Sequence, residues 1–255
     1  MKEQLYTIPL RDAFMAEDEC AFCNIERKLE QDAISFSLGS SYMEEDIRDM
    51  TDKEGFCRHH YKMMFDYGNQ LGNALMLETH IKKVKETLKK QMEDFSPSKA
   101  SFVKRMKKTQ IQQENKKTSI GQWVREFESS CYVCNYFESS YNRYLDTFFE
   151  MLEKDSEFYE MVKESRGFCI HHFGDIIEAS NDKLKDSFKE KFYPMIYELM
   201  DHNMERILED VSWFVEKYDY RNRDKEWKNS KDAIPRAMQK LKGGYPADPV
   251  FMENR

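Results

Sequence analysis

The sequence predicts an all-α protein, a helical bundle built from two pseudo-repeats that each carry a CxxC…CxxH metal knuckle. Apolar residues recur at spacings of three and four along most of the chain, which is the periodicity of a helix with one buried face. Strand signals are nearly absent. All six cysteines fall into two copies of one pattern, Cys-x-x-Cys followed by Gly-Phe-Cys-x-His-His. The second copy makes the signal strong, because chance rarely repeats such a pattern.

The first repeat is predicted to span residues 1–95. Apolar spacing predicts a helix from Phe22 to Ser37, a short polar helix around Tyr42 to Met50, and one long amphipathic helix from Arg58 to about Phe95. Gly55 is expected to form the tight turn that brings Cys57 back to the first cysteine pair. Gly68 and Gly72 are four residues apart, so they predict a stripe where another helix packs closely.

The second repeat is predicted to span residues 123–219, with a C-terminal aromatic tail over 220–255. Helices are expected from Tyr132 to about Leu152 and near Phe158 to Lys163. Pro194 is placed in the first turn of a further helix that continues to Tyr218, because proline fits that position. A short helical run is expected near Ala233 to Leu241, and the aromatic residues of the tail predict that it docks on the body.

Residues 96–122 are predicted to be a basic linker between the repeats. Lysines and arginines outnumber acidic residues there, but aromatic residues for base stacking are missing apart from Phe102. We therefore favour a solvated linker or helix face over a contact for nucleic acid. The net charge of −7 also argues against bulk attraction to nucleic acid or to anionic membranes.

The expected compartment decides between two fates of the cysteines. The chain begins without an apolar stretch after its basic residue, and nowhere do about eighteen apolar residues run together. These features predict a cytoplasmic protein, and cytoplasmic thiols are kept reduced, so metal binding is favoured over disulfides. We favour zinc, two ions per chain, over an iron–sulfur cluster and over a metal-free redox dithiol, which both stay open.

Helix geometry selects one histidine of each His-His pair. Cys57 and His60 are three residues apart and share a helix face, whereas His59 points about 160° away from Cys57. The same reasoning selects His172 over His171. We predict that each repeat binds its own ion, through Cys20, Cys23, Cys57 and His60 in the first repeat and through Cys131, Cys134, Cys169 and His172 in the second. For His59 and His171, a hydrogen bond to a carbonyl or carboxylate is favoured over catalysis or pH sensing.

Four protein ligands close a zinc site, which favours a structural role over hydrolysis, and no catalytic motif accompanies the cysteines. We therefore prefer a non-enzymatic zinc protein that binds an unknown protein or small-molecule ligand. A thiol or metal redox sensor, or a metal-handling protein, is the second hypothesis. An iron–sulfur or metal-dependent enzyme that uses a histidine of each His-His pair is the third.

Several segments carry a resemblance to a known family. They are Leu5 to Phe14, Glu19-Cys20-x-x-Cys23, Gly55-Phe56-Cys57-x-x-His60, Leu75-x-Leu77-x-Thr79-His80 and Lys217 to Arg221. Together they resemble an uncharacterised bacterial family, the domain of unknown function 6062, over essentially the full length. The resemblance implies a two-site metal-binding helical protein and implies no reaction.

Overall fold

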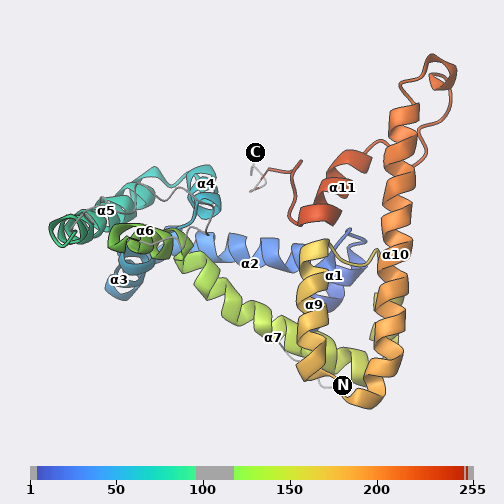
Figure 1. Cartoon of the computed structure of the whole chain (residues 1–255), viewed down its shortest axis with the longest axis horizontal. Helices are drawn as coiled ribbons and strands as arrows, with labels where there is room; N and C mark the ends of the chain where they lie inside the picture. Colours follow the sequence, from blue (N-terminus) through green and yellow to red (C-terminus); the bar gives the residue numbers. More distant parts are fainter. Residues whose placement is uncertain (1–4, 96–117, 250, 252–255) are drawn as a thin grey trace, which may run out of the picture. The chain divides into compact units, whose positions relative to one another are not determined.

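A computed structural model describes residues 5–95, 118–249 and 251. These residues form eleven α-helices and contain no strand, which confirms the all-α fold class (Figure 1). No helix among them combines the length and the apolar character needed to cross a membrane. Of the predicted linker 96–122, residues 96–117 lie outside the described residues, and α6 (Ser119–Ser129) begins within its last four residues.

The chain forms two compact units. Unit 1 comprises residues 1–31 and 137–255, and unit 2 comprises residues 32–136. These limits differ from the segments 1–95, 96–122, 123–219 and 220–255 that we drew from motif spacing, which stay a prediction about sequence organisation. Two helices contain the boundaries, since α2 (Ala21–Leu38) and α7 (Tyr132–Lys154) each begin in one unit and end in the other.

Unit 1 holds five further helices around an aromatic core. They are α1 (Thr7–Met15), α8 (Ser156–Glu164), α9 (Ile170–Lys183), α10 (Asp186–Glu216) and α11 (Ala233–Lys242). Phe22 and Phe168, both inside the cysteine motifs, are fully buried with ring centres 6.0 Å apart, and Phe148 lies within 6.0 Å of both. Each buried phenylalanine contributes about 2–3 kcal/mol of hydrophobic stabilisation. The core of unit 1 is therefore built directly on the motif residues.

Unit 2 holds α3 (Glu45–Glu54), α4 (Arg58–Tyr67), α5 (Gln70–Glu93) and α6. Helix α5 packs against α3 and α6, and its His80 stacks on Phe127 of α6 with ring centres 5.9 Å apart. The His80 ring is buried, and its Nδ1 lies 2.9 Å from the carbonyl oxygen of Asp52 in α3. His80 therefore joins three helices of unit 2.

Several expected helices are present, and two expected helix boundaries are wrong. The predicted helix from Phe22 to Ser37 lies within α2, and the run near Ala233 to Leu241 is α11. The single helix predicted from Arg58 to Phe95 is instead two helices. Gly68 ends α4 with a left-handed φ of 86°, and the side chain of Asn69 then caps α5 by accepting a hydrogen bond from the Gly72 amide.

Gly68 and Gly72 therefore belong to the interruption between α4 and α5, and they do not form a stripe where another helix packs closely. A Cβ at Gly68 would meet no atom within 4 Å, and one at Gly72 would meet the Asn69 side chain. Pro194 is the second correction, because it lies inside α10 and does not begin a helix. Proline removes one helical hydrogen bond, but the neighbouring buried residues Phe192, Met195 and Ile196 hold this segment against the core.

Replacing Gly68 tests whether its left-handed backbone is what separates α4 from α5. Because nothing occupies the space around its Cβ position, Gly68→Ala changes only backbone energy, and we expect a loss of about 1 kcal/mol in stability. Gly174→Ala, in α9 and equally uncrowded, is the control and should gain about 0.5–1 kcal/mol. Thermal unfolding followed by helical circular dichroism measures both, and equal midpoints would contradict the assignment.

Candidate metal centres

Two clusters of three cysteines and one histidine lie in the described residues, one in each unit. Site A, in unit 1, consists of Cys20, Cys23, Cys169 and His172. Site B, in unit 2, consists of Cys57, His60, Cys131 and Cys134. Within each cluster the candidate ligand atoms lie within 4.8 Å of one another. All eight predicted ligand residues thus fall in these clusters, and each cluster has the predicted composition of three sulfurs and one ring nitrogen.

The predicted grouping of the ligands is wrong. Neither repeat gathers its own four residues, because each site combines the CxxC pair of one motif with the CxxH pair of the other. The reason is the length of the helix that follows the first CxxC pair. Helix α2 continues for 18 residues, about 27 Å at 1.5 Å per residue, so its first and last turns belong to different units.

Site B forms beside the last turns of α2. The side chain of Tyr132, the residue after Cys131, interacts with the side chain of Ser37 in the last turn of that helix. The turn before Cys57 is held there as well, since the Gly55 carbonyl accepts a hydrogen bond of 2.9 Å from the Tyr132 amide. The CxxH pair of the first motif therefore meets the CxxC pair of the second.

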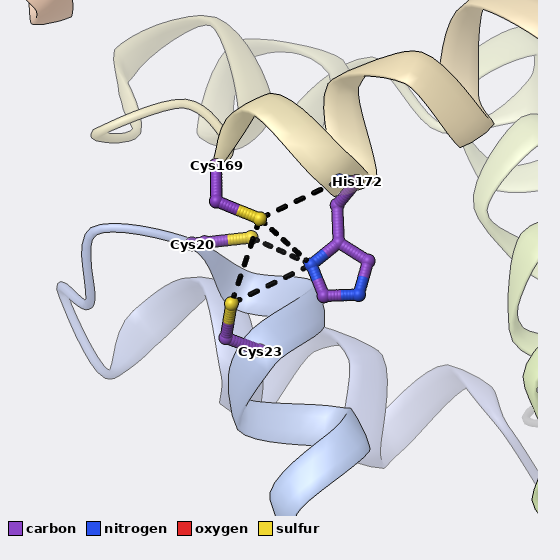
Figure 2. Close-up of side chains that lie close together, drawn as sticks. All are labelled: Cys20, Cys23, Cys169 and His172. Atoms are coloured by element: carbon purple, nitrogen blue, oxygen red, sulfur yellow. Dashed lines mark hydrogen bonds between the residues drawn. The ribbon is translucent and has the colours of Figure 1, made fainter. Parts of the chain in front are cut away.

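In site A the three sulfurs converge on Nδ1 of His172 (Figure 2). Cys20 and Cys23 come from the start of α2, and Cys169 and His172 from the start of α9. The Sγ atoms of Cys20, Cys23 and Cys169 lie 3.3, 3.5 and 3.2 Å from Nδ1 of His172. The Sγ atoms of Cys23 and Cys169 are 3.7 Å apart.

Site B repeats this arrangement. The Sγ atoms of Cys57 and Cys131 each lie 3.2 Å from Nδ1 of His60, and that of Cys134 lies 3.5 Å away. Both histidines thus present the same ring nitrogen to their sulfurs. His60 and His172, the two that helix geometry selected, are the cluster members, whereas His59 and His171 are exposed neighbours.

These distances fit four ligands around a single ion. Tetrahedral zinc with bonds of about 2.3 Å to sulfur and about 2.05 Å to nitrogen separates two sulfurs by about 3.8 Å and sulfur from nitrogen by about 3.6 Å. The separations in both sites, from 3.2 to 3.7 Å, are close to these edges. The donor set is also that of a soft, tetrahedral metal. Both clusters are therefore compatible with metal binding.

The family of the chain follows from comparison with known proteins. Residues 1–248 match the family described as a family of unknown function, DUF6062. The chain belongs to this family. No match was found among proteins of curated function or among solved structures. What this DUF6062 protein does therefore has to be argued from its own two sites.

Each cluster of the DUF6062 chain lies at two helix N-termini. Cys57 and Cys169 are the N-caps of α4 and α9, and Cys20 and Cys131 directly precede α2 and α7. The free N–H groups and the dipole at a helix start stabilise negative charge, and so favour thiolate over thiol. In site A the Cys169 sulfur also accepts a hydrogen bond from the His172 amide. The N-termini of these four helices therefore stabilise negatively charged sulfur ligands, which favours the binding of a cation in both sites.

Hydrogen bonds among the sulfurs have the same effect. Bonds from Cys20 and Cys23 hold the pKa of the Cys169 thiol far below its usual value, against the effect of burial. In site B a hydrogen bond from Cys134 lowers the pKa of Cys131 to about 3. The same hydrogen bonds raise the pKa of the partner thiols Cys23 and Cys134. Each cluster therefore favours a thiolate at one sulfur, and a divalent cation would favour deprotonation of the remaining thiols as well.

A carboxylate faces the outer nitrogen of the site A histidine. Nε2 of His172 lies 3.5 Å from Oε2 of Glu26, one turn along α2 from Cys23. Burial raises the pKa of the Glu26 carboxyl, and the charge of His172 opposes that rise. Nε2 of His172 has no hydrogen-bond partner among the described residues, so Glu26 acts on it as a nearby charge. With a metal bound at Nδ1, a carboxylate in this position would favour the ring proton on Nε2, an arrangement common around metal-binding histidines.

The turns before Cys57 and Cys169 need glycine. Gly55 and Gly167 have φ angles of 62° and 74°, which L side chains rarely adopt. A Cβ at Gly55 would also lie 2.7 Å from the His80 ring. The predicted tight turn at Gly55 is confirmed, and it explains why both motifs carry glycine two residues before the cysteine.

The C-terminal segment covers site A. Helix α11 packs against α9 and α10 (Figure 1), and a Cβ at Gly243, directly after α11, would touch the sulfurs of Cys23 and Cys169 at 3.4 Å. The fully buried Lys240 donates hydrogen bonds to the backbone carbonyls of Glu19 and Arg166, which precede the two halves of the site. The predicted docking of the tail is confirmed for Tyr245, whose hydroxyl donates to Asp18.

The two sites differ in exposure. In site A all four side chains are buried, with no residue more than 2 % exposed. In site B Cys134 is exposed and Cys57 is partly exposed. A cavity of about 510 Å³ opens beside Cys57, lined also by His59 and Phe56. His171, the counterpart of His59, lies 3.7 Å from Asp175, one turn along α9.

Paired cysteine substitutions test which residues share an ion. Because Cys20 and Cys169 belong to one site, Cys20→Ser/Cys169→Ser should retain about one metal ion per chain. Cys20→Ser/Cys57→Ser damages both sites and should retain almost none. Elemental analysis of the purified proteins measures the difference. The opposite order of metal contents would restore the grouping by repeat.

Removing the charge beside His172 tests the role of Glu26. Glu26→Gln keeps the shape of the side chain but loses the carboxylate, so site A should bind metal about tenfold more weakly. Glu178→Gln, at an exposed position of α9, is the matched control and should change nothing. Competition with a chromophoric chelator measures the affinities, and equal values for the two variants would exclude an orienting role for Glu26.

Proposed function

We propose that this protein binds two zinc ions, one in site A and one in site B, and that both ions are structural. The observation that carries the proposal is the convergence of three sulfurs and Nδ1 at tetrahedral separations in each unit. An iron–sulfur cluster fits less well, since its protein ligands bind different irons and so lie farther apart than ligands of one ion.

Four protein ligands leave no open position for a substrate or an activated water, in contrast to catalytic zinc. Each ion would instead tie the starts of two helices together, α2 with α9 in unit 1 and α4 with α7 in unit 2. Zinc binding would then supply folding free energy to each unit. We propose a non-enzymatic binding module for a protein or small-molecule ligand, acting in the cytoplasm, where thiolates stay reduced.

The first test of this proposal is the identity and number of the bound ions. Protein purified without oxygen should contain about two zinc ions per chain and should be colourless, because zinc has a filled d shell. Removing both ions with a chelator should abolish most of the helical circular dichroism, and adding zinc back should restore it. A brown protein that contains iron would replace the zinc assignment.

A second candidate function, a thiol or metal redox sensor, is favoured by the exposure of site B. Cys134 is exposed and the cavity reaches Cys57, so an oxidant could approach these thiolates. Peroxide, reduced to water by two electrons, would join two of the thiolates as a disulfide and release the ion. Site A, fully buried beneath α11, would be protected.

The difference in exposure predicts two rates of metal release. A chelator in excess should remove one ion quickly, from site B, and the other slowly, from site A. Cys134→Ser should remove the fast phase and leave the slow one, whereas Cys23→Ser should do the reverse. Stopped-flow absorbance of a chromophoric chelator measures both phases. Release of both ions at a single rate would contradict the proposed difference between the sites.

A further inference from the structure

A cavity of about 440 Å³ in unit 1 is lined mainly by cationic side chains. We call it the arginine pocket and define it by Arg166, Arg206, Lys228, Lys231 and Arg236, with the carboxylates of Asp210 and Asp232. The residues come from the turn before Cys169, from α10, from the segment that leads into α11, and, for Arg236, from α11 itself. The volume is that of a site for a small molecule.

Positive charge exceeds negative charge in this pocket. Five cations line it against two carboxylates, and the buried Glu19 and Lys240 behind it add no net charge. Glu19 is shared among several cations, with Oε1 3.1 Å from Arg206 and 3.4 Å from Arg236, and Oε2 3.3 Å from Lys240. One carboxylate cannot neutralise all of them, so the pocket keeps an excess of positive charge that an anion would balance.

Arg206 and Arg236 are held in position by carboxylates. Both terminal nitrogens of Arg236 lie 3.0 Å from Asp210, and its Nε lies 3.0 Å from Asp232. Both terminal nitrogens of Arg206 bond Glu19, which is 2 % exposed. Guanidinium groups fixed in this way lose little conformational freedom when they bind a ligand.

Arg166 and Lys228 are more accessible to a ligand. The side chain of Arg166 is 40 % exposed, and its nearest carboxylates are the exposed Glu17 at 3.4 Å and Glu19 at 3.8 Å. Lys228 has a left-handed φ of 52°, a costly backbone for lysine, and its ammonium lies 4.5 Å from the centre of the Trp213 ring. A pocket with two arginines held in place and further cations exposed to solvent suits a ligand whose charged group enters first.

We propose that the arginine pocket binds the phosphate group of a small phosphorylated metabolite. A phosphate dianion matches the excess charge better than a single carboxylate, and its oxygens can accept several hydrogen bonds from the flat forks of arginine side chains. The pocket is distinct from both metal centres, although Glu19, which bonds Arg206 of the pocket, directly precedes Cys20. This site would give the binding module a definite class of ligand.

The test uses the metal-loaded full chain and inorganic phosphate as the probe. Phosphorus NMR titrations in a chloride buffer should show saturable binding of one phosphate per chain. Acetate at the same ionic strength should compete only weakly. Arg166→Gln should weaken phosphate binding about tenfold, the loss expected for one charge-assisted hydrogen bond. Arg143→Gln removes an equal charge from an exposed position of α7 and should leave binding unchanged.

Lys231→Gln serves as a second variant, since Lys231 is exposed and its loss should weaken phosphate binding without disturbing the fold. Metal content, measured in every variant, separates this proposal from that of the zinc sites. Three results would each overturn it: no saturable phosphate binding by the unmodified protein, acetate binding as tight as phosphate binding, or Arg166→Gln and Lys231→Gln both binding phosphate as well as Arg143→Gln.

Discussion

The structure depends on the meeting of three sulfurs with one imidazole nitrogen, which happens once in each unit. In both places the meeting joins helix starts that lie far apart in the sequence, Cys20 with Cys169 and Cys57 with Cys131. A structural zinc ion in a small peptide contributes about 10–16 kcal/mol at neutral pH. A whole domain is stable by about 5–15 kcal/mol. An ion in each cluster would therefore supply stabilisation comparable to the total.

What surrounds the clusters makes them unequal although their ligands are the same. Site A adjoins an aromatic core and is covered by the end of α11, where Lys240 bonds the chain on both sides of the site. In site B, Cys134 reaches solvent and Cys57 is partly exposed. Under the proposed function, unit 1 retains its ion and its structure longer, and unit 2 loses its ion first. The arginine pocket lies in unit 1, the more stable unit, which suits a ligand site that must keep its shape.

Much of the candidate site could be predicted from local sequence. Residue type and spacing pointed to the cysteines, and the three-residue spacing of Cys57 and His60 selected the histidine that lies in the cluster. The grouping could not be predicted, because 33 residues separate Cys23 from Cys57 and 34 separate Cys134 from Cys169, so either pairing satisfies the pattern. The grouping depends on α2 and α7, which each run from one unit into the other. The break at Gly68 was missed because apolar spacing continues through it. Glu19 and Lys240 lie 221 residues apart in the sequence and carry no local signal.

The cross-motif grouping can be observed directly by cadmium–proton correlation NMR on protein in which ¹¹³Cd replaces the native ions. Cadmium binds the same thiolate and imidazole ligands and couples through bonds to the β protons of each cysteine. The account predicts two cadmium signals. One should correlate with Cys20, Cys23 and Cys169, and the other with Cys57, Cys131 and Cys134. A cadmium signal that correlates with Cys20, Cys23 and Cys57 together would contradict the account.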